Sequence, residues 1–238
     1  MQASRQLHLM EKAPSGLHDF CEGLLDKYVT KDLKILDIAS GTGAMSRRLI
    51  KNGYQNIVAN DIDAASFAAQ EVRFTSVDLN KDFSNMFGVN TFDVIVAIEI
   101  IEHLENPIAF VKECNKVLKP DGYLLLTTPN VLGTESIMQL LTRRELLYFS
   151  SECYDKLGHI SVLPDWLLCK HITKSGFKII FQGYSPRLLL RAASINPSKI
   201  LGCLLLKTLD LIALCLGRSK SETVGTNYVV LARKDRAI

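Results

Sequence analysis

Short apolar runs alternate with amphipathic helical patterns along the first half of the chain. The segment Leu17–Val29 has helical periodicity, because Leu17, Phe20 and Leu24 fall on one face. Further helical patterns lie at 44–51 and 108–118. Runs typical of strands lie at 33–36, 57–61, 72–77, 92–99 and 123–130. This alternation predicts an α/β fold, in which a parallel sheet has helices on both faces.

The alternation breaks after the fifth predicted strand. Residues 131–163 contain apolar helical stretches and then Gly158 and His159. Connections at the carboxyl edge of such a sheet usually carry the functional site, so we expect a substrate lid over 131–163. The next segment, 164–176, predicts a helix that a glycine ends.

Two apolar runs near the end of the chain predict further strands. Phe177–Tyr184 and Tyr228–Ala232 would form an antiparallel pair that closes the sheet, with a long insertion between them. We therefore expect a single domain over 1–238, with its core at about 30–185 and 225–235.

The insertion, at about 197–217, is unusually apolar. Ile200–Leu216 is seventeen mostly apolar residues, and Lys207 and Asp210 stand near its centre. Each charge would cost about 2.5–3.5 kcal/mol in a bilayer, so we reject a transmembrane helix. The helix could instead pack as extra core, form a homodimer contact, or lie in a membrane interface. We favour the first two possibilities, packing as extra core or a homodimer contact. The basic residues beside it are Arg187, Arg191, Lys199, Arg218 and Lys220.

Composition and charge limit the class of protein. The chain has 238 residues, 47% of them hydrophobic, which is ample for a core, and a net charge of +3. From Arg187 onward the balance is +6, so the preceding residues carry −3. No arginine-rich or aromatic-interleaved stripe predicts nucleic-acid binding. The six cysteines form no C-x-x-C pair, and the N-terminus has no apolar leader, so we expect a cytoplasmic protein, with peripheral membrane contact as the alternative.

A glycine turn follows the first predicted strand. The segment Asp37-Ile-Ala-Ser-Gly41-Thr-Gly43 leads from the apolar run 33–36 into a helical pattern. Glycines there let the backbone bend sharply and approach a ligand, and the start of the helix offers unpaired N–H groups. Asp37 would be out of place beside a phosphate, but it suits a cofactor with positive charge and hydrogen-bond donors. The pattern predicts a pocket for a nucleotide-type cofactor.

These residues resemble the motifs of class I S-adenosylmethionine-dependent methyltransferases, in order and spacing, from about Leu33 to Asn130. The turn is similar to the family's D-x-[GA]-x-G-x-G, with Ala39 where its first glycine often stands. The resemblance implies a Rossmann-like, doubly wound, mainly parallel seven-stranded sheet with a C-terminal antiparallel strand and a helical insertion. It also implies cofactor-binding roles, for Asp61 at the ribose, for Asp78 and Leu79 at the adenine, and for Asp37, Ala39, Gly41, Gly43 and Glu99 around the rest of S-adenosylmethionine.

Two other classes of protein stay open. An acid after the second strand also occurs in domains of NAD(P)-dependent oxidoreductases. Those domains favour G-x-G-x-x-G, whereas the last position here is Ser46, and they lack an acid where Asp37 stands. A non-catalytic cofactor-binding protein is the second alternative, and the intact acids and histidine after the fourth strand argue against it.

Those residues form the segment Glu99-Ile-Ile-Glu102-His103. If Glu99 opens a helical turn, Glu102 and His103 return to its side, at the mouth of the pocket. Glu102 and His103 are the candidate catalytic residues, with His103 as a base. The E-x-x-E-H spacing also resembles the metal site of small-RNA 2′-O-methyltransferases and ubiquinone-pathway O-methyltransferases. That resemblance implies a divalent metal on Glu99, Glu102, His103 and a later histidine, for which His159 is the candidate.

Because the candidate ligands are oxygen and nitrogen atoms, the bound metal could be Mg²⁺, Mn²⁺, Fe²⁺ or Zn²⁺. In the simpler interpretation, Glu99 lines the cofactor pocket, Glu102 caps a helix and His103 acts alone. The combined hypothesis is an S-adenosylmethionine-dependent methyltransferase that methylates the oxygen of a small-molecule, lipid-like or glycan-linked hydroxyl. The hydroxyl acceptor follows from the E-x-x-E-H resemblance, and the apolar, basic C-terminal region favours a lipid-like, quinone-like or glycan-linked substrate.

Overall fold

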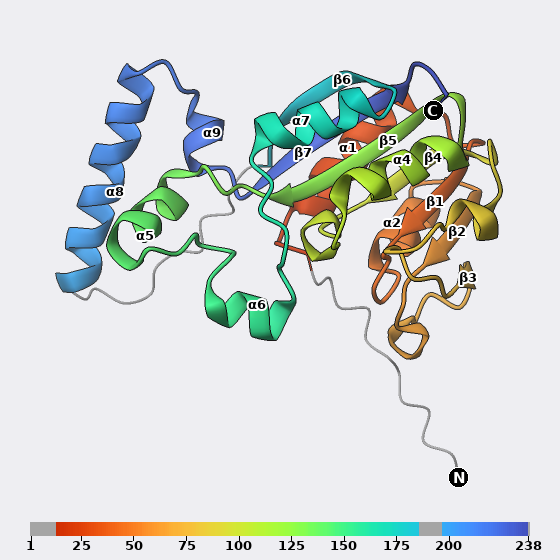
Figure 1. The fold of residues 1–238 in the computed structure, drawn as a ribbon, viewed down its shortest axis with the longest axis horizontal. Helices are drawn as coiled ribbons and strands as arrows, with labels where there is room; N and C mark the ends of the chain where they lie inside the picture. Colours follow the sequence, from red (N-terminus) through yellow and green to blue (C-terminus); the bar gives the residue numbers. More distant parts are fainter. Residues whose placement is uncertain (1–12, 186–196, 238) are drawn as a thin grey trace, which may run out of the picture.

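The computed structural model describes residues 13–185 and 197–237, except for the side chains of 197–205. Its centre is a seven-stranded sheet in the order β3-β2-β1-β4-β5-β7-β6 (Figure 1). The first five strands are parallel, and β7 is antiparallel to both of its neighbours. The strands are β1 (Lys34–Ile38), β2 (Asn56–Asn60), β3 (Arg73–Thr75), β4 (Phe92–Ala97), β5 (Leu118–Pro129), β6 (Phe177–Tyr184) and β7 (Asn227–Lys234).

The strand order confirms the predicted Rossmann-like fold and the antiparallel pair near the C-terminus. Residues 119–122, whose sequence Lys-Pro-Asp-Gly is typical of a turn, lie inside β5, where the register against β4 shifts between Phe92 and Val94. Asp121 takes a left-handed backbone there, with φ of 63°. The turn is thus a local irregularity in the strand.

Helices cover both faces of the sheet because successive strand residues point to opposite sides. Ile35 joins the core formed with α1 and α2, whereas Leu36 joins the core formed with α4 and α7. The helices are α1 (Leu17–Tyr28), α2 (Ala44–Lys51), η1 (Ala64–Ser66), α3 (Ser84–Phe87), η2 (Ile101–His103), α4 (Pro107–Val117), α5 (Thr134–Arg143), α6 (Ser151–Leu157), α7 (Asp165–Lys174), α8 (Pro197–Cys215) and α9 (Lys220–Val224).

Helices α5, α6, α8 and α9 extend beyond the carboxyl end of β5 (Figure 1). There α5 and α6 occupy the predicted lid, and α8 and α9 occupy the insertion between β6 and β7 (Figure 1). Within the described residues, no helix is both long enough and apolar enough to cross a membrane. Arg187 and Arg191, which the sequence placed beside the insertion, lie outside the described residues, as does the side chain of Lys199.

Candidate active site

The glycine turn joins the end of β1 to the start of α2. Gly41 donates its backbone N–H to Asp61 Oδ2 at 2.8 Å, so the first turn is tied to the acid that follows β2. Ala39, Gly41 and Gly43 all have left-handed backbones, with φ of 55°, 54° and 83°. Ala39 is therefore strained where a glycine would not be.

Gly43 serves the packing of the chain itself. A Cβ atom at this position would stand 2.6 Å from Ala69 Cβ and 2.8 Å from the Phe67 ring. The sequence predicted a glycine that lets the backbone approach a ligand. The structure shows that Gly43 also lets the turn pack against the segment before β3.

Asp37 is a buried carboxylate at the end of β1, only 2% exposed. Burial raises the pKa of Asp37 to about 7, the hydroxyl of Ser46 opposes this by donating to Oδ2, and the nearby Asp61 adds to it. Ser46, which stood out in the sequence as a departure from a glycine motif, thus orients Asp37. A carboxylate with a pKa near 7 can be ionised by a cationic ligand at neutral pH.

A large pocket opens over this turn, with an empty volume of about 1530 Å³ that is partly open to solvent. Its walls include eight residues that the sequence singled out: Asp37, Ala39, Gly41, Asp61, Glu99, Glu102, His103 and His159. Among the described residues, Asp78 and Leu79 are not part of these walls. Leu79 is buried in the core, and Asp78 accepts from the Asn80 N–H and pairs with Lys81.

Glu99 lies just after β4 with a left-handed backbone, at φ of 50°. Its Oε1 accepts a hydrogen bond from Thr127 Oγ1 at 2.7 Å, and its Oε2 accepts from Asn227 Nδ2 at 2.6 Å. Burial raises the pKa of Glu99 to about 7, although both hydrogen bonds oppose this. The carboxylate is therefore held against β5 and β7, and Glu99 does not open the helical turn that the spacing suggested.

Glu102, His103 and His159 do come together. One potential ligand atom from each lies within 4.8 Å of the others. Glu102 is completely buried, and its Oε2 accepts from Thr128 Oγ1. Its Oε1 has no hydrogen-bond partner among the described residues. That free oxygen is 4.0 Å from His103 Nε2. Burial, and then the charge of Glu99, raise the pKa of Glu102 well above its usual value.

The two imidazoles are oriented by backbone carbonyl groups. His103 Nδ1 is 3.2 Å from the Gly158 oxygen, and His159 Nδ1 is 2.7 Å from the Tyr148 oxygen. A carbonyl only accepts, so each Nδ1 carries the hydrogen and each Nε2 keeps its lone pair. Burial and the neighbouring His159 lower the pKa of His103, which favours the neutral ring. The arrangement offers two nitrogen lone pairs beside a buried carboxyl group.

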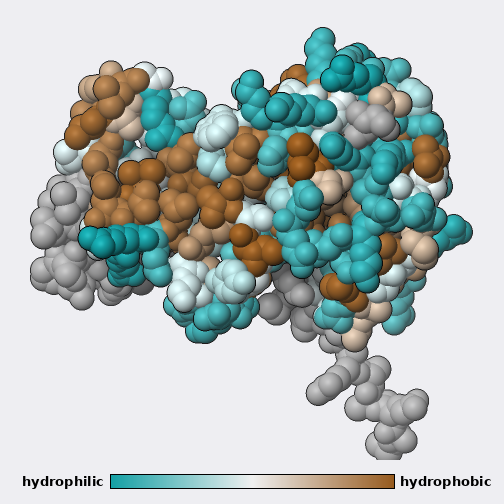
Figure 2. All heavy atoms as spheres, in the orientation of Figure 1, coloured by the Kyte–Doolittle hydropathy of each residue, from teal (hydrophilic) through white to brown (hydrophobic). Residues whose placement is uncertain are grey.

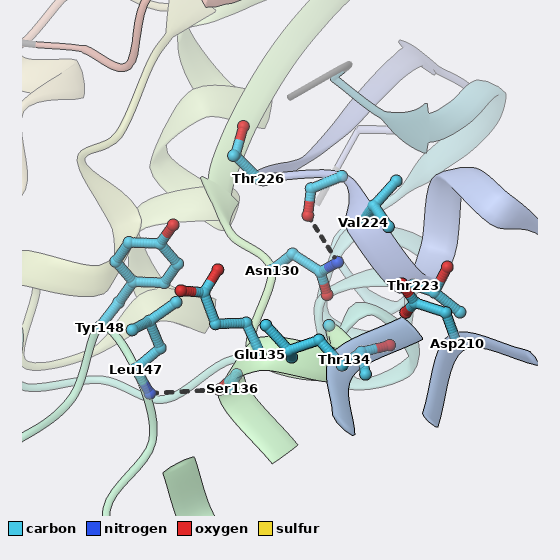
Figure 3. Close-up of a pocket in the computed structure, with 13 residues that line it drawn as sticks. Asn130, Thr134, Glu135, Ser136, Leu147, Tyr148, Asp210, Thr223, Val224 and Thr226 are labelled. Carbon is cyan, nitrogen blue, oxygen red and sulfur yellow. Dashed lines mark hydrogen bonds between the residues drawn. The ribbon is translucent and has the colours of Figure 1, made fainter. Parts of the chain in front are cut away.

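A second, smaller pocket lies next to the first, between α5, α8 and α9 (Figure 3). Tyr148 lines both pockets. Figure 3 shows Glu135 and Tyr148 on one side of this pocket and Asp210 beside Thr223 on the other. Asp210 Oδ1 is buried and, within the part of the chain that the structure describes, has no hydrogen-bond partner. The space beside the first pocket is thus lined by polar groups from the insertion as well as from the predicted lid.

Sequence reasoning missed several residues that build the site. Thr127 and Asn227 hold Glu99, but they stand on β5 and β7, and no local motif marks them. His18 of α1 also lines the pocket. Tyr148 and Lys156 fall inside the predicted lid, so the break in strand and helix alternation was the signal that could have found them.

Comparisons with known proteins bear on this site. The chain is 28% identical over 126 residues to the ubiquinone biosynthesis O-methyltransferase of Pseudomonas aeruginosa, which covers 46% of this chain and 54% of that protein. It is 30% identical over 128 residues to the protein of the same name from Parvibaculum lavamentivorans, which covers 48% and 50%. The chain therefore matches about half the length of these relatives.

Solved structures share the fold. A SAM-dependent methyltransferase from Archaeoglobus fulgidus superposes with a TM-score of 0.62 at 15% identity, over 91% of this chain and 94% of that one. The [4+2]-cyclase SpnF superposes with a TM-score of 0.58 at 15% identity, over 91% and 81%. At such identities the likeness concerns the fold alone, and the fold can support different chemistry.

A family model described as a methyltransferase domain matches residues 8–182, which is most of the chain. The match spans the glycine turn, the acid after β2 and the E-x-x-E-H segment. It favours a methyltransferase over the nicotinamide-dependent alternative. The chain belongs to the methyltransferase domain family, in its class I, S-adenosylmethionine-dependent form.

Proposed function

We propose that this chain transfers a methyl group from S-adenosylmethionine to the hydroxyl oxygen of a small-molecule, lipid-like or glycan-linked acceptor. The observation that carries the proposal is the shared pocket, in which Asp37, Gly41 and Asp61 stand beside Glu102, His103 and His159. The acids suit a ligand with a sulfonium charge and ribose hydroxyl groups, and the second group suits a hydroxyl that must lose its proton.

Methyl transfer is an in-line displacement. The carbon–sulfur bond breaks, the oxygen–carbon bond forms, and the hydroxyl proton passes to a base. His103 is the candidate base, because its Nε2 keeps a lone pair and its lowered pKa leaves the ring neutral near pH 7. Glu102, 4.0 Å away, would stabilise the imidazolium that results.

The same three side chains support a second role as ligands of a divalent cation. The oxygen of Glu102 that has no partner and the two Nε2 atoms, held by the backbone at Nδ1, fit the N and O donor set of Mg²⁺, Mn²⁺, Fe²⁺ or Zn²⁺. A bound cation would lower the pKa of an acceptor hydroxyl. Glu99 stands outside this set, because both of its oxygens accept hydrogen bonds from the chain.

Two observations support the acceptor class. The curated relatives are named as O-methyltransferases of ubiquinone biosynthesis, which supports oxygen as the methylated atom. The second pocket, which shares Tyr148 with the first, would offer part of an acceptor a position between α5 and α8. Its hydroxyl and carboxylate lining would accept hydrogen bonds from a polar acceptor.

The test is transfer of a radiolabelled methyl group from S-adenosylmethionine into lipid and soluble extracts of the producing cell. Labelled product that resists mild base and that the Glu102→Gln variant does not form would support O-methylation of an alcohol or phenol. Labelled product on nitrogen or carbon would refute the acceptor assignment, and the absence of any labelled product would refute the activity.

A further inference from the structure

Exposed aliphatic side chains gather on two neighbouring helices that extend beyond the sheet. On α5 they include Leu141, which is 73% exposed, and on α8 they include Leu211 at 66%. Leu216, just after α8, is 79% exposed. Figure 2 shows hydrophobic residues gathered over α5 and α8 on the visible face. We call this surface the α5–α8 platform; its described apolar members are Leu140, Leu141, Leu211, Ile212, Leu214 and Leu216.

The charges around the platform are sorted by sign. Within the described side chains of 134–149 and 206–222, every exposed charged residue is basic: Arg143, Arg144, Lys207 and Lys220. The carboxylates of the same segments are all half-buried: Glu135, Glu145, Asp210 and Glu222. Exposed leucines interspersed with exposed basic residues, without exposed acids, complement a surface that is apolar beneath a negatively charged layer. The neighbouring helix α6 carries exposed charges of both signs and is not part of the platform.

The platform is joined to the reaction centre. The carboxyl end of β5 points toward α5 (Figure 1), and the pocket between α5, α8 and α9 shares Tyr148 with the cofactor pocket. An acceptor that leaves a lipid surface at the platform would therefore meet the pocket mouth without crossing the sheet. A dimer contact would have no need of this continuity.

We infer that the α5–α8 platform docks on an anionic lipid bilayer and delivers a membrane-borne acceptor to the site. The leucines enter the level of the headgroups, and the arginines and lysines contact the lipid phosphates. The inference rests on the proposed function in one respect, which is that delivery of an acceptor is the purpose of docking. Docking itself requires neither the methyl donor nor turnover. Lipid binding and cofactor binding can therefore each fail alone.

The test is flotation of the full chain with vesicles of phosphatidylcholine, with and without phosphatidylglycerol, at low and high salt. We expect binding only with phosphatidylglycerol, and weaker binding at high salt. The double variant Arg143→Gln with Arg144→Gln should bind anionic vesicles about 30-fold more weakly, because each basic residue near such a surface contributes about 1 kcal/mol. Leu141→Gln with Leu211→Gln should weaken binding at least about tenfold.

A matched control replaces an exposed apolar and an exposed basic residue far from the platform, by Met86→Gln in α3 and Lys51→Gln in α2. It should bind vesicles as the wild type does. Stabilisation by S-adenosylhomocysteine, measured without vesicles, should be equal in all variants and shows that each one folds. Failure of the wild type to float with anionic vesicles would overturn the inference. So would a dimer, found by light scattering, that the leucine substitutions dissociate while vesicle binding persists.

Discussion

The rings of His103 and His159 meet edge to face, with centroids 4.7 Å apart and an interplanar angle of 83°. One ring comes from the 3₁₀ turn after β4 and the other from the loop after α6. Each is oriented through its Nδ1 by a backbone carbonyl, so both Nε2 atoms remain available beside Glu102. The segment predicted as a lid thus supplies one of the three groups in this cluster.

This relationship predicts that removing His159 weakens the binding of a divalent cation at the proposed site. Mn²⁺ binding, followed by electron paramagnetic resonance, should be at least about tenfold weaker in His159→Ala, since a lost ligand or its support typically costs about 10–100-fold. The control is His171→Ala, because His171 lies on α7 outside the pocket walls. Equal Mn²⁺ binding by wild type and His159→Ala would contradict the metal role, whereas His103 could still act as a base.

Glu102 should affect turnover and leave cofactor affinity unchanged. The Glu102→Gln variant keeps the shape of the buried carboxyl group, whose raised pKa favours the neutral form, so the protein should fold. Unlike the wild-type side chain, however, glutamine cannot ionise when a charge forms on His103 or when a cation binds. We expect kcat to fall by about 100-fold or more, while the Kd for S-adenosylhomocysteine stays within about twofold. The control is Glu105→Gln, because Glu105 is exposed and lies two residues after η2. Activity that survives both Glu102→Gln and a chelator would contradict both proposed roles.

Asp37 should make the cofactor-free protein less stable as pH rises. Its pKa is raised from 3.8 in the unfolded chain to about 7 in the folded protein. The stability associated with the protonated form is fully present below pH 4, decreases above it, and is lost as pH rises through about 7. Asp37→Asn should remove this dependence and, at pH 8, add roughly 2–4 kcal/mol to the free energy of unfolding.

The same substitution should weaken binding of S-adenosylmethionine, because the sulfonium loses a nearby carboxylate. Denaturant unfolding at pH 5 and pH 8, with and without the cofactor, measures both effects. If the free energy of unfolding depends on pH equally in Asp37→Asn and in the wild type, burial does not raise the pKa of Asp37.

Gly43 should not tolerate a side chain. A Cβ atom would meet Ala69 and Phe67 at less than 3 Å, and the residue has a left-handed backbone. Gly43→Ala should lower the free energy of unfolding by about 1–3 kcal/mol. The control is Gly53→Ala, which shares a left-handed backbone (φ 90°) but has nothing within 4 Å. Equal losses in the two variants would mean that backbone strain, and not contact with Phe67 and Ala69, explains the need for glycine.

Local sequence patterns predicted the alternation of strands and helices and the glycine turn after β1, because each of these patterns lies within a short stretch of the chain. The seven-stranded sheet followed from the family resemblance, and the structure confirms it. The partners of Glu99 could not be found this way, since Thr127 and Asn227 reach it from strands that pair only in the folded sheet. Helical spacing suggested that Glu99 and Glu102 converge. The left-handed backbone of Glu99 turns its carboxylate toward β5 and β7 instead.

Calorimetric titration of the chain with S-adenosylhomocysteine tests the central claim most directly. We predict binding at one site per chain, no binding of NAD⁺ or NADP⁺, and affinity at least about tenfold weaker in Asp61→Ala, where buried ribose hydroxyls would lose their acceptor. The exposed Asp63→Asn variant should bind as the wild type does. A wild-type chain that does not bind S-adenosylhomocysteine, or an Asp61→Ala variant with unchanged affinity, would contradict the account.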